Sequence, residues 1–280
     1  MQAATLLESD ALSVYAFRCT AGPGDRPFAE MHVRHSLSYV RRGSFGCRIG
    51  ARRYELVAGA LLVGRPGLEY MATHEHHGCG DECLSFKFSP AFADSLGKTN
   101  AWQTATVPPV AELMLLGELG QAAADARSSV ALDEVGTLIA DKFVAVIGGE
   151  RERKFETPLR ERRRAIEAAL WLEENAAEPV RLEDAARRAG LSAFHFLRVF
   201  RRVTGVTPHQ YLVRRRLARA AKLLAEETLP VTEVALESGF ADLSNFVRTF
   251  GRAAGVSPKR FRSAARGERK ILQDRLAAAT

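Results

Sequence analysis

The sequence predicts an α+β protein, in which a small β-barrel or sandwich precedes an all-α domain. Three observations support this prediction. Short segments of alternating apolar and polar residues, separated by glycine and proline, occupy the first part of the chain. Helical periodicity replaces this alternation from residue 109 onward. The last part repeats one helical pattern twice, and it is basic where the first part is acidic.

Charge is divided unevenly along the 280 residues. Residues 1–150 contain 13 Lys and Arg against 17 Asp and Glu, whereas residues 151–280 contain 27 against 16. The second half is therefore the part that we expect to meet phosphate groups. No apolar run reaches the length of a membrane span, and the amino terminus lacks a signal segment. Because the four cysteines also lack the spacing of a disulfide scaffold, we expect a cytoplasmic protein with no membrane partner.

Residues 1–108 are predicted to form the β domain. A short strand is expected at residues 13–19, strand-like alternation begins at Met31, and residues 50–52 have the sequence of a hairpin turn. Pro90 ends the last strand. That strand alternates two sets of residues, which are Leu84, Phe86 and Phe88 on one face and Cys83, Ser85 and Lys87 on the other.

Histidine and cysteine are concentrated just before this last strand. Neutral imidazole and thiolate are good ligands for Zn²⁺ and for softer ions. The glycines of the segment favour a loop instead. Two interpretations stay open: a metal or redox site, and a structural or effector-lining loop. The candidate metal ligands are His74, His76, His77, Cys79 and Cys83.

Residues 109–148 change to a helical period. Val110, Leu113 and Met114 predict one helix, and a longer amphipathic helix follows from the spacing of Leu132, Val135, Ile139, Phe143 and Val146. Residues 149–159 are polar, charged and without periodicity, which predicts a linker. Residues 265–280 form a tail to which we assign no role.

Residues 160–264 contain the repeated pattern. Ala186 and Gly190 recur 49 residues later as Ala235 and Gly239. A second set recurs 50 residues later, where Arg198, Phe200, Gly205 and Pro208 correspond to Arg248, Phe250, Gly255 and Pro258. Such self-similarity indicates a duplicated supersecondary unit.

Each copy has the form of a helix-turn-helix. A short helix is followed by Gly190 or Gly239, where the backbone needs a positive φ. Ser192 or Asp242 can then cap the second helix by accepting a backbone N–H. Between the copies, a long helix is predicted to begin at Pro208 and to end near Glu226. At about 1.5 Å per residue, its roughly 19 residues span close to 28 Å, which suits two helices about 34 Å apart in successive major grooves.

The second helix of each copy has one apolar face, formed by Phe196, Val199, Phe200 and Val203 and then by Phe246, Phe250 and Ala253. The opposite face is the kind that a recognition helix presents to base edges. Arg198 and Arg248 are candidates for bidentate contacts with guanine, with phosphate contact as the alternative. Phe194 and Leu197 could belong to the core instead. The candidate DNA-contacting residues are Phe194, His195, Leu197, Arg198, Arg201, Ser244, Asn245, Val247 and Arg248.

These motifs resemble the DNA-binding domain of the AraC/XylS family of bacterial transcription regulators. The resemblance covers residues 165–262 and rests on motifs such as Gly190-Leu191-Ser192, Arg198-Val199-Phe200, Gly239-Phe240 and Ser257-Pro258. It implies that residues matching Phe194, Leu197, Arg198, Ser244, Asn245 and Arg248 read DNA. The strand order of residues 28–90 is similar to the cupin-like effector domain that many members carry first. Helices placed like residues 109–148 often pair two subunits in the family, although packing on their own barrel is equally consistent with the pattern.

The sequence therefore predicts a cupin-like β-barrel sensor domain followed by an all-α domain with two helix-turn-helix motifs. Its predicted function is sequence-specific DNA-binding transcription regulation, with activation and control by an effector at the amino-terminal domain. Double-stranded DNA, a second copy of the chain and, by resemblance, RNA polymerase are the expected partners. A metal ion or a small-molecule effector could bind, and no enzyme activity is expected.

Two other classes of protein would use the same types of residue. A cupin-fold metal-dependent enzyme would need two histidines and a carboxylate that converge on an open site, and the spacing of the histidines does not supply them. A cysteine-based alkyl-acceptor repair protein fused to a DNA-binding domain would need a four-thiolate site, which the positions of Cys19, Cys47, Cys79 and Cys83 do not resemble.

Overall fold

The computed structural model describes residues 2–75, 80–97, 100–147, 157–226 and 228–266, and it confirms the predicted α+β class. The strands are β1 (Gln2–Glu8), β2 (Leu12–Cys19), β3 (Phe28–Met31), β4 (His35–Ile49), β5 (Arg52–Val57), β6 (Leu61–Gly64), β7 (Glu69–Thr73), β8 (Asp81–Phe88) and β9 (Thr106–Val107). The helices are α1 (Pro90–Ser95), α2 (Ala111–Ala124), α3 (Leu132–Ile147), α4 (Leu159–Glu174), α5 (Leu182–Arg188), α6 (Ala193–Thr204), α7 (Pro208–Glu226), α8 (Val231–Glu237), α9 (Leu243–Ala254) and α10 (Pro258–Ala265).

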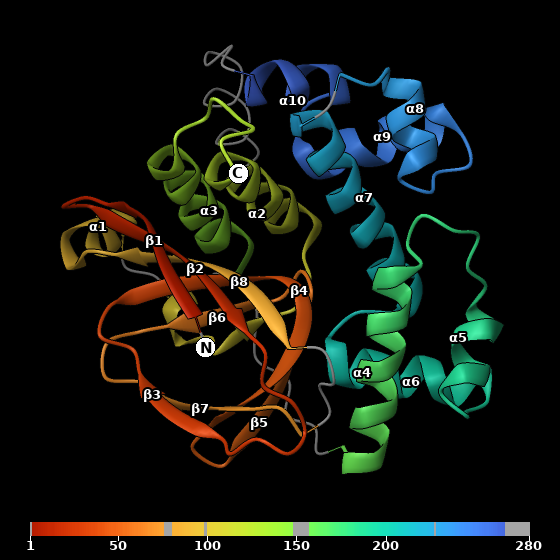
Figure 1. The fold of residues 1–280 in the computed structure, drawn as a ribbon, viewed down its shortest axis with the longest axis horizontal. Coiled ribbons are helices and arrows are strands. Elements are labelled where there is room, and N and C mark those ends of the chain that lie inside the picture. Colours follow the sequence, from red (N-terminus) through yellow and green to blue (C-terminus); the bar gives the residue numbers. More distant parts are fainter. Residues whose placement is uncertain (1, 76–79, 98–99, 148–156, 227, 267–280) are drawn as a thin grey trace.

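The long strand β4 belongs to two antiparallel sheets. Its first part, residues 35–43, pairs with β8 and β6, and its second part, residues 44–49, pairs with β5 and β7. Gly43 lies at the change with a φ of +75°, where a Cβ would come within 2.1 Å of the Gly80 carbonyl oxygen. Only glycine allows this close approach of two backbones. The first sheet has the order β1-β2-β8-β4-β6-β9, and β3 pairs with β7 in the second (Figure 1).

The alternation along β8 separates the hydrophobic core from a cavity. Leu84, Phe86 and Phe88 are fully buried in a cluster with apolar residues of α2 and α3. Cys83, Ser85 and Lys87 instead line a cavity between the sheets. Because successive side chains of a strand point to opposite faces, one face of the first sheet packs against the helices and the other lines the cavity.

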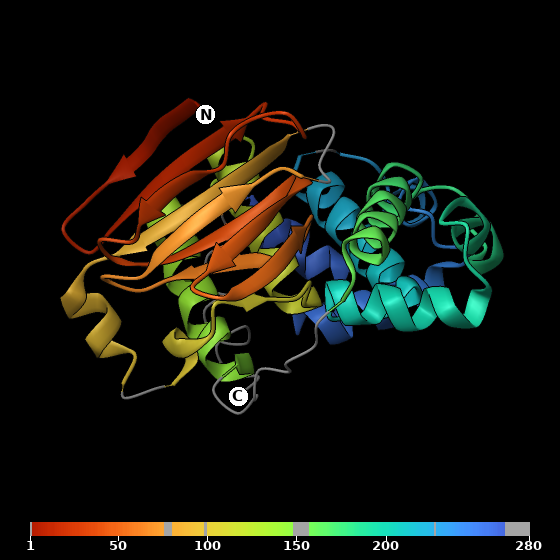
Figure 2. The same ribbon diagram turned by 90° about the horizontal axis from the view of Figure 1, so that it is seen from below.

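Helix α2 lies against the sheet on one side and the carboxyl-terminal helices on the other. All residues from Leu113 to Gly120 are buried. One continuous core runs from Phe86 of the sheet through Leu116 of α2 to Leu224 of α7 and Phe250 of α9. The two halves of the chain are therefore packed together, as Figures 1 and 2 show from two directions. Of the two alternatives for α2 and α3, this arrangement corresponds to packing on their own barrel.

Polar contacts reinforce this packing at three places. A guanidinium nitrogen of Arg162 in α4 lies 3.6 Å from a carboxylate oxygen of Glu55 in β5. Arg127, after α2, forms a 2.7 Å ion pair with Glu226 at the end of α7. The backbone N–H of Ser129 donates to the carbonyl oxygen of Ala265 at 2.9 Å.

Several predicted elements lie where the sequence places them. Strand β2 contains residues 13–19, the hairpin turn at residues 50–51 joins β4 to β5, and the spacer helix runs from Pro208 to Glu226. The sequence predicts one short strand before residue 20, whereas the structure contains two, because the largely exposed β1 pairs with β2 at the edge of the sheet. Most of the predicted linker, residues 149–156, and nearly all of the tail, residues 267–280, lie outside the described residues.

Candidate nucleic-acid interface and sensor cavity

Both helix-turn-helix units have the predicted turns and caps. Gly190 and Gly239 have φ values of +62° and +86°. A Cβ at Gly239 would lie 2.6 Å from the Ala176 carbonyl oxygen, so this turn is also a close contact with the loop after α4. The hydroxyl of Ser192 accepts from the backbone N–H of His195, and the carboxylate of Asp242 accepts from that of Asn245 at 2.7 Å.

The same aromatic arrangement fixes the second helix of each unit. The ring centroids of Phe196 and Phe200 in α6 are 5.5 Å apart, as are those of Phe246 and Phe250 in α9. In each unit a ring from the following helix meets the second phenylalanine edge-on, at 5.8 Å for Tyr211 and 5.3 Å for Phe261. Such tilted and edge-on pairs are favourable geometries for buried rings. They determine which face of α6 and of α9 points outward.

The outward face of α6 carries most of the residues predicted to contact DNA. Phe194 is 71% exposed, so it does not belong to the core, and Arg198 and Arg201 are exposed as well. Leu197 is half-buried and contributes partly to packing. The guanidinium carbon of Arg198 lies 5.9 Å from the centre of the Phe194 ring, a cation–π distance. His195 is exposed, and its Nε2 lies 3.2 Å from an oxygen of Glu161 in α4.

The outward face of α9 is more polar. Ser244, Asn245, Val247 and Arg248 are all exposed. Arg248 donates from a guanidinium nitrogen to Oδ1 of Asn245 at 3.3 Å, so these two side chains are held together. The exposed face thus presents a guanidinium and an amide, which are the groups that read guanine and adenine edges.

Helix α7 separates the two exposed faces, with α6 near one end and α9 near the other (Figure 1). Its arginines tie the units to the spacer. Arg216 donates to the carbonyl oxygens of Ala176 and Glu178, both at 2.8 Å, and Arg219 donates to that of Glu237 at 2.7 Å. These arginines therefore hold the geometry of the domain.

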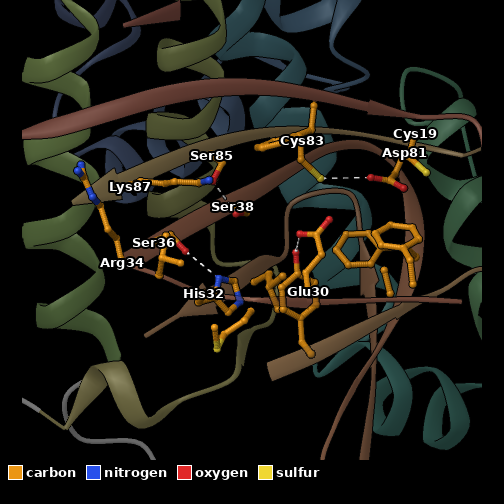
Figure 3. Close-up of a pocket in the computed structure, with 18 of the residues that line it drawn as sticks. Cys19, Glu30, His32, Arg34, Ser36, Ser38, Asp81, Cys83, Ser85 and Lys87 are labelled. Carbon is orange, nitrogen blue, oxygen red and sulfur yellow. Dashed lines mark hydrogen bonds between the residues drawn. The ribbon is translucent and has the colours of Figure 1, made fainter. Parts of the chain in front are cut away.

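The amino-terminal domain contains a cavity of about 110 Å³ between its two sheets. Figure 3 shows polar groups along the length of the cavity. Lys87, Arg34, His32 and Ser36 lie toward one end, and Cys83, Asp81 and Cys19 lie toward the other, where His74 contacts Cys19 and Asp81. Apolar side chains also line the cavity, namely those of Phe17, Phe28, Phe45, Leu62 and Ala72. Glu30 adds a carboxylate, which accepts a hydrogen bond from the Tyr70 hydroxyl.

His32 stays neutral in this cavity. Burial, together with the charge of Lys87, lowers its pKa to about 4. Its Nδ1 lies 3.4 Å from the Ser36 hydroxyl oxygen, and its ring stacks on Tyr70 with centroids 4.5 Å apart. Its Nε2 is buried without a hydrogen-bond partner among the described residues. A buried polar atom of this kind is suited to a bound molecule.

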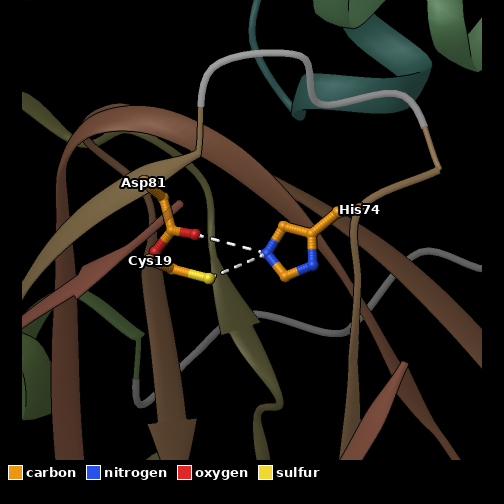
Figure 4. A group of neighbouring side chains, drawn as sticks. All are labelled: Cys19, His74 and Asp81. Atoms are coloured by element: carbon orange, nitrogen blue, oxygen red, sulfur yellow. Dashed lines mark hydrogen bonds and ion pairs between the residues drawn. The ribbon is translucent and has the colours of Figure 1, made fainter. Parts of the chain in front are cut away.

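The predicted metal ligands are only partly described. His74 and Cys83 line the cavity, but His76, His77 and Cys79 lie outside the described residues. Cys19 and Asp81, which the sequence did not single out, join His74 in one buried group, shown in Figure 4. Cys19 is 55 residues from His74 in the chain, so sequence spacing carries no signal of their contact.

The described residues contain neither the metal site that a cupin-fold enzyme would need nor the four-thiolate site of an alkyl-acceptor repair protein. The potential metal-binding group found there contains one histidine, His74, and one cysteine, Cys19. His35 packs against Trp102 with ring centroids 4.8 Å apart, and His32 is held by Ser36 and Tyr70. This part of the chain therefore brings together neither two histidines with a carboxylate nor four thiolates.

The carboxyl-terminal part of the chain is similar to known proteins. A helix-turn-helix domain model matches residues 185–264. The transcriptional activator AarP of Providencia stuartii is 33% identical over 106 residues, which are 38% of this chain and 78% of AarP. The multiple antibiotic resistance protein MarA of Escherichia coli is 32% identical over 103 residues, which are 36% of this chain and 81% of MarA. The solved DNA-binding domain of AdpA with a target DNA is 35% identical, with a TM-score of 0.35, and the match covers 36% of this chain and 90% of that domain.

A helix-turn-helix unit that occurs twice, with one long helix between the two copies, defines a DNA-binding transcription regulator. The chain belongs to the AraC/XylS family of such regulators. In the described parts of the chain, no helix combines the length and the apolar character that crossing a membrane requires.

Proposed function

We propose that the protein reads a specific DNA sequence with the outward faces of α6 and α9. The observation that carries this proposal is the pair of exposed arginines, Arg198 and Arg248, at equivalent places of two duplicated units on either side of α7. Each arginine is positioned by a neighbour on its own helix, Phe194 in α6 and Asn245 in α9. A preorganised guanidinium loses less conformational freedom when it binds the two acceptors of guanine.

The remaining residues predicted to contact DNA fit complementary roles. Phe194, Leu197 and Val247 can contact thymine methyl groups, and Ser244 and Asn245 can form hydrogen bonds with base edges. His195 and Arg201 are suited to phosphate contacts. Selection of bound DNA from a random pool by the full-length protein tests the proposal. One recurring motif is expected, and a pool that stays unselected would contradict sequence-specific reading.

We also propose that the amino-terminal region is a cupin-like effector domain whose cavity binds a small molecule. Within the described residues, the contacts of the Lys87 ammonium are with the rings of Tyr15 and Phe17, and Arg34 and the neutral His32 lie at the same end of the cavity. An anionic group would therefore be favoured there, with its apolar part against Phe17 and Phe28. The effector would be a small organic anion with an apolar body.

A link between cavity and DNA-binding domain supports effector control. Ser38 lines the cavity, and the next residue of β4, Tyr39, points to the other face and donates to Glu118 of α2. Helix α2 packs in turn on α7 and α9. A ligand that moves β4 would thus bias the position of the recognition helices, which is what control of DNA affinity requires.

Ligand binding tests the effector proposal. Isothermal titration of the full-length protein with a panel of small aromatic and aliphatic carboxylates should give binding that Lys87→Met weakens at least tenfold. The control is Lys259→Met, which removes an exposed charge from α10 and should leave ligand binding unchanged. Equal binding by the Lys87→Met variant would contradict the assignment of the anionic end.

We further propose that the protein activates transcription as a homodimer that contacts RNA polymerase, and that it has no catalytic role. Activation is suggested by relatives such as AarP, which is named as an activator. The buried residues of α2 and α3 pack within one subunit, so a dimer contact made by this segment would use the exposed face of α3. Sedimentation velocity with and without DNA tests the assembly.

A further inference from the structure

Three potential metal ligands from separate parts of the sheet meet at one end of the cavity. Cys19 ends β2, and Asp81, which begins β8, is its direct partner in the antiparallel register. His74 follows β7 and enters from the second sheet. Its Nε2 lies 3.5 Å from Sγ of Cys19 and 3.5 Å from an oxygen of Asp81, as Figure 4 shows. All three ligand atoms lie within 4.8 Å of one another.

These separations match the edges of a tetrahedral zinc site. Bond lengths of about 2.3 Å for Zn–S and about 2.0 Å for Zn–N give an edge of about 3.5 Å at the tetrahedral angle. One ion could therefore contact the thiolate and the imidazole with little movement of either side chain. Cys83 stands two residues after Asp81 on the same face of β8, with its Sγ 3.4 Å from the other oxygen of Asp81. Its Sγ lies outside the group of three ligand atoms that are within 4.8 Å of one another, so it becomes the fourth ligand when its side chain turns toward the ion.

Burial and donor chemistry favour an ion in this place. Cys19, His74 and Asp81 are 7%, 4% and 8% exposed. A buried carboxylate is costly unless a positive charge compensates it. Arg18 and Arg41 pair with the neighbouring Glu82, at 3.7 and 3.2 Å, and the ion pair of Asp81 is with His74. Two sulfurs, one imidazole nitrogen and one carboxylate oxygen suit Zn²⁺, whereas Mg²⁺ and Ca²⁺ prefer sites made of oxygen.

We propose that Cys19, His74, Asp81 and Cys83 bind one Zn²⁺ ion, or an ion of similar softness. The ion joins β2 and β8 of the first sheet to the segment after β7 of the second. It closes the end of the cavity opposite Lys87 and fixes the distance between the two sheets there. This proposal is independent of the effector and of the DNA sequence that is read.

Metal analysis of the full-length protein tests the proposal. The protein is stripped with a chelator, reloaded with Zn²⁺ and dialysed, and the bound metal is then counted by mass spectrometry. One equivalent is expected for the parent protein and for Cys47→Ala, which removes a buried thiol outside the group. Cys19→Ala and His74→Gln should each weaken Zn²⁺ binding at least tenfold. Titration with Co²⁺ should give tetrahedral d–d bands and a thiolate charge-transfer band that both variants lose.

A variant of the same side-chain size distinguishes a loss of metal binding from a failure to fold. Asp81→Asn keeps the size of the side chain, and circular dichroism should show it folded while its Zn²⁺ affinity falls. The proposal is overturned if the parent protein holds no more Zn²⁺ than Cys19→Ala. It is also overturned if Zn²⁺ binding is lost only when His76, His77 or Cys79 is replaced. Because the metal is counted without DNA, this outcome is distinguishable from a failure of DNA binding.

Discussion

Replacing Tyr39 with phenylalanine should destabilise the protein through the contact between its two halves. The Tyr39 hydroxyl donates to Oε1 of Glu118 at 2.8 Å, and both side chains are buried. Burial raises the pKa of Glu118, an effect that Arg215 of α7 and the hydrogen bond from Tyr39 partly offset. Arg215 also donates to Glu173 of α4 at 3.1 Å. Strand β4 and helices α2, α7 and α4 therefore meet in one buried polar network.

The expected loss follows from this arrangement. The phenyl ring is retained, and it packs so closely on α2 that a Cβ at Gly117 would lie 2.6 Å from it. Little cavity is therefore created, and the main effect is a buried carboxyl group that lacks its donor. Leaving such a group unsatisfied costs roughly 1–3 kcal/mol. The free energy of unfolding, measured with urea on the full-length protein, should fall by about that amount.

Tyr15→Phe provides the matched control. Tyr15 is a half-buried residue of β2 whose ring lies beside Lys87, away from the network. Its replacement should change the free energy of unfolding by less than about 0.5 kcal/mol. Equal effects of the two substitutions would refute the argument that the Tyr39–Glu118 contact stabilises the packed arrangement.

Three other predictions concern the cap of α9, the buried carboxyl group of Glu173 and the binding of DNA. Asp242→Ala removes the cap of α9 and should lower the free energy of unfolding by about 1 kcal/mol, whereas Asp242→Asn should restore most of it. Burial raises the pKa of Glu173 from 4.5 to about 7, so the folded protein keeps this carboxyl group protonated at pH values at which the unfolded chain ionises it. The contribution of this group to the free energy of unfolding is therefore full below pH 4.5 and is lost as the pH rises through about 7. The free energy of unfolding of Glu173→Gln, relative to that of the parent protein, should therefore rise by roughly 1–3 kcal/mol between about pH 5 and pH 8. A difference between the two proteins that does not change with pH would contradict this assignment. The affinity of the full-length protein for DNA should fall more than about tenfold between about 50 and 200 mM salt; salt-insensitive binding would contradict the expected phosphate contacts of the carboxyl-terminal domain.

The carboxyl-terminal fold could be predicted because its signals are local. Gly190 and Ser192 mark a turn and a cap within three residues, and the spacing of Phe196 and Phe200 identifies the buried face of α6. Pro208 marks the start of α7. Each of these signals depends on residues within one or two helical turns, and the duplication supplied every signal twice.

The sensor cavity depends on contacts between distant residues. Cys19 faces Asp81 only because β2 pairs with β8 in one register, and a shift by one residue would place Cys19 on the other face. The sequence indicated His74 and Cys83 but not these partners. The same holds for Tyr39 and Glu118, which are 79 residues apart. In the sequence, Glu118 is one of two carboxylates in a largely apolar helix, and its partner could not be identified.

The most direct test of the account is to ask where each recognition helix acts on DNA. Arg198→Ala and Arg248→Ala are each profiled by selection from a random DNA pool beside the parent protein. Each variant should lose about 1–3 kcal/mol at specific sites and should lose its preference at one base pair. The two affected positions should lie about ten base pairs apart, one helical turn of DNA. Loss of preference at the same position, or uniform weakening on every sequence by both variants, would contradict the claim that α6 and α9 read two successive major grooves.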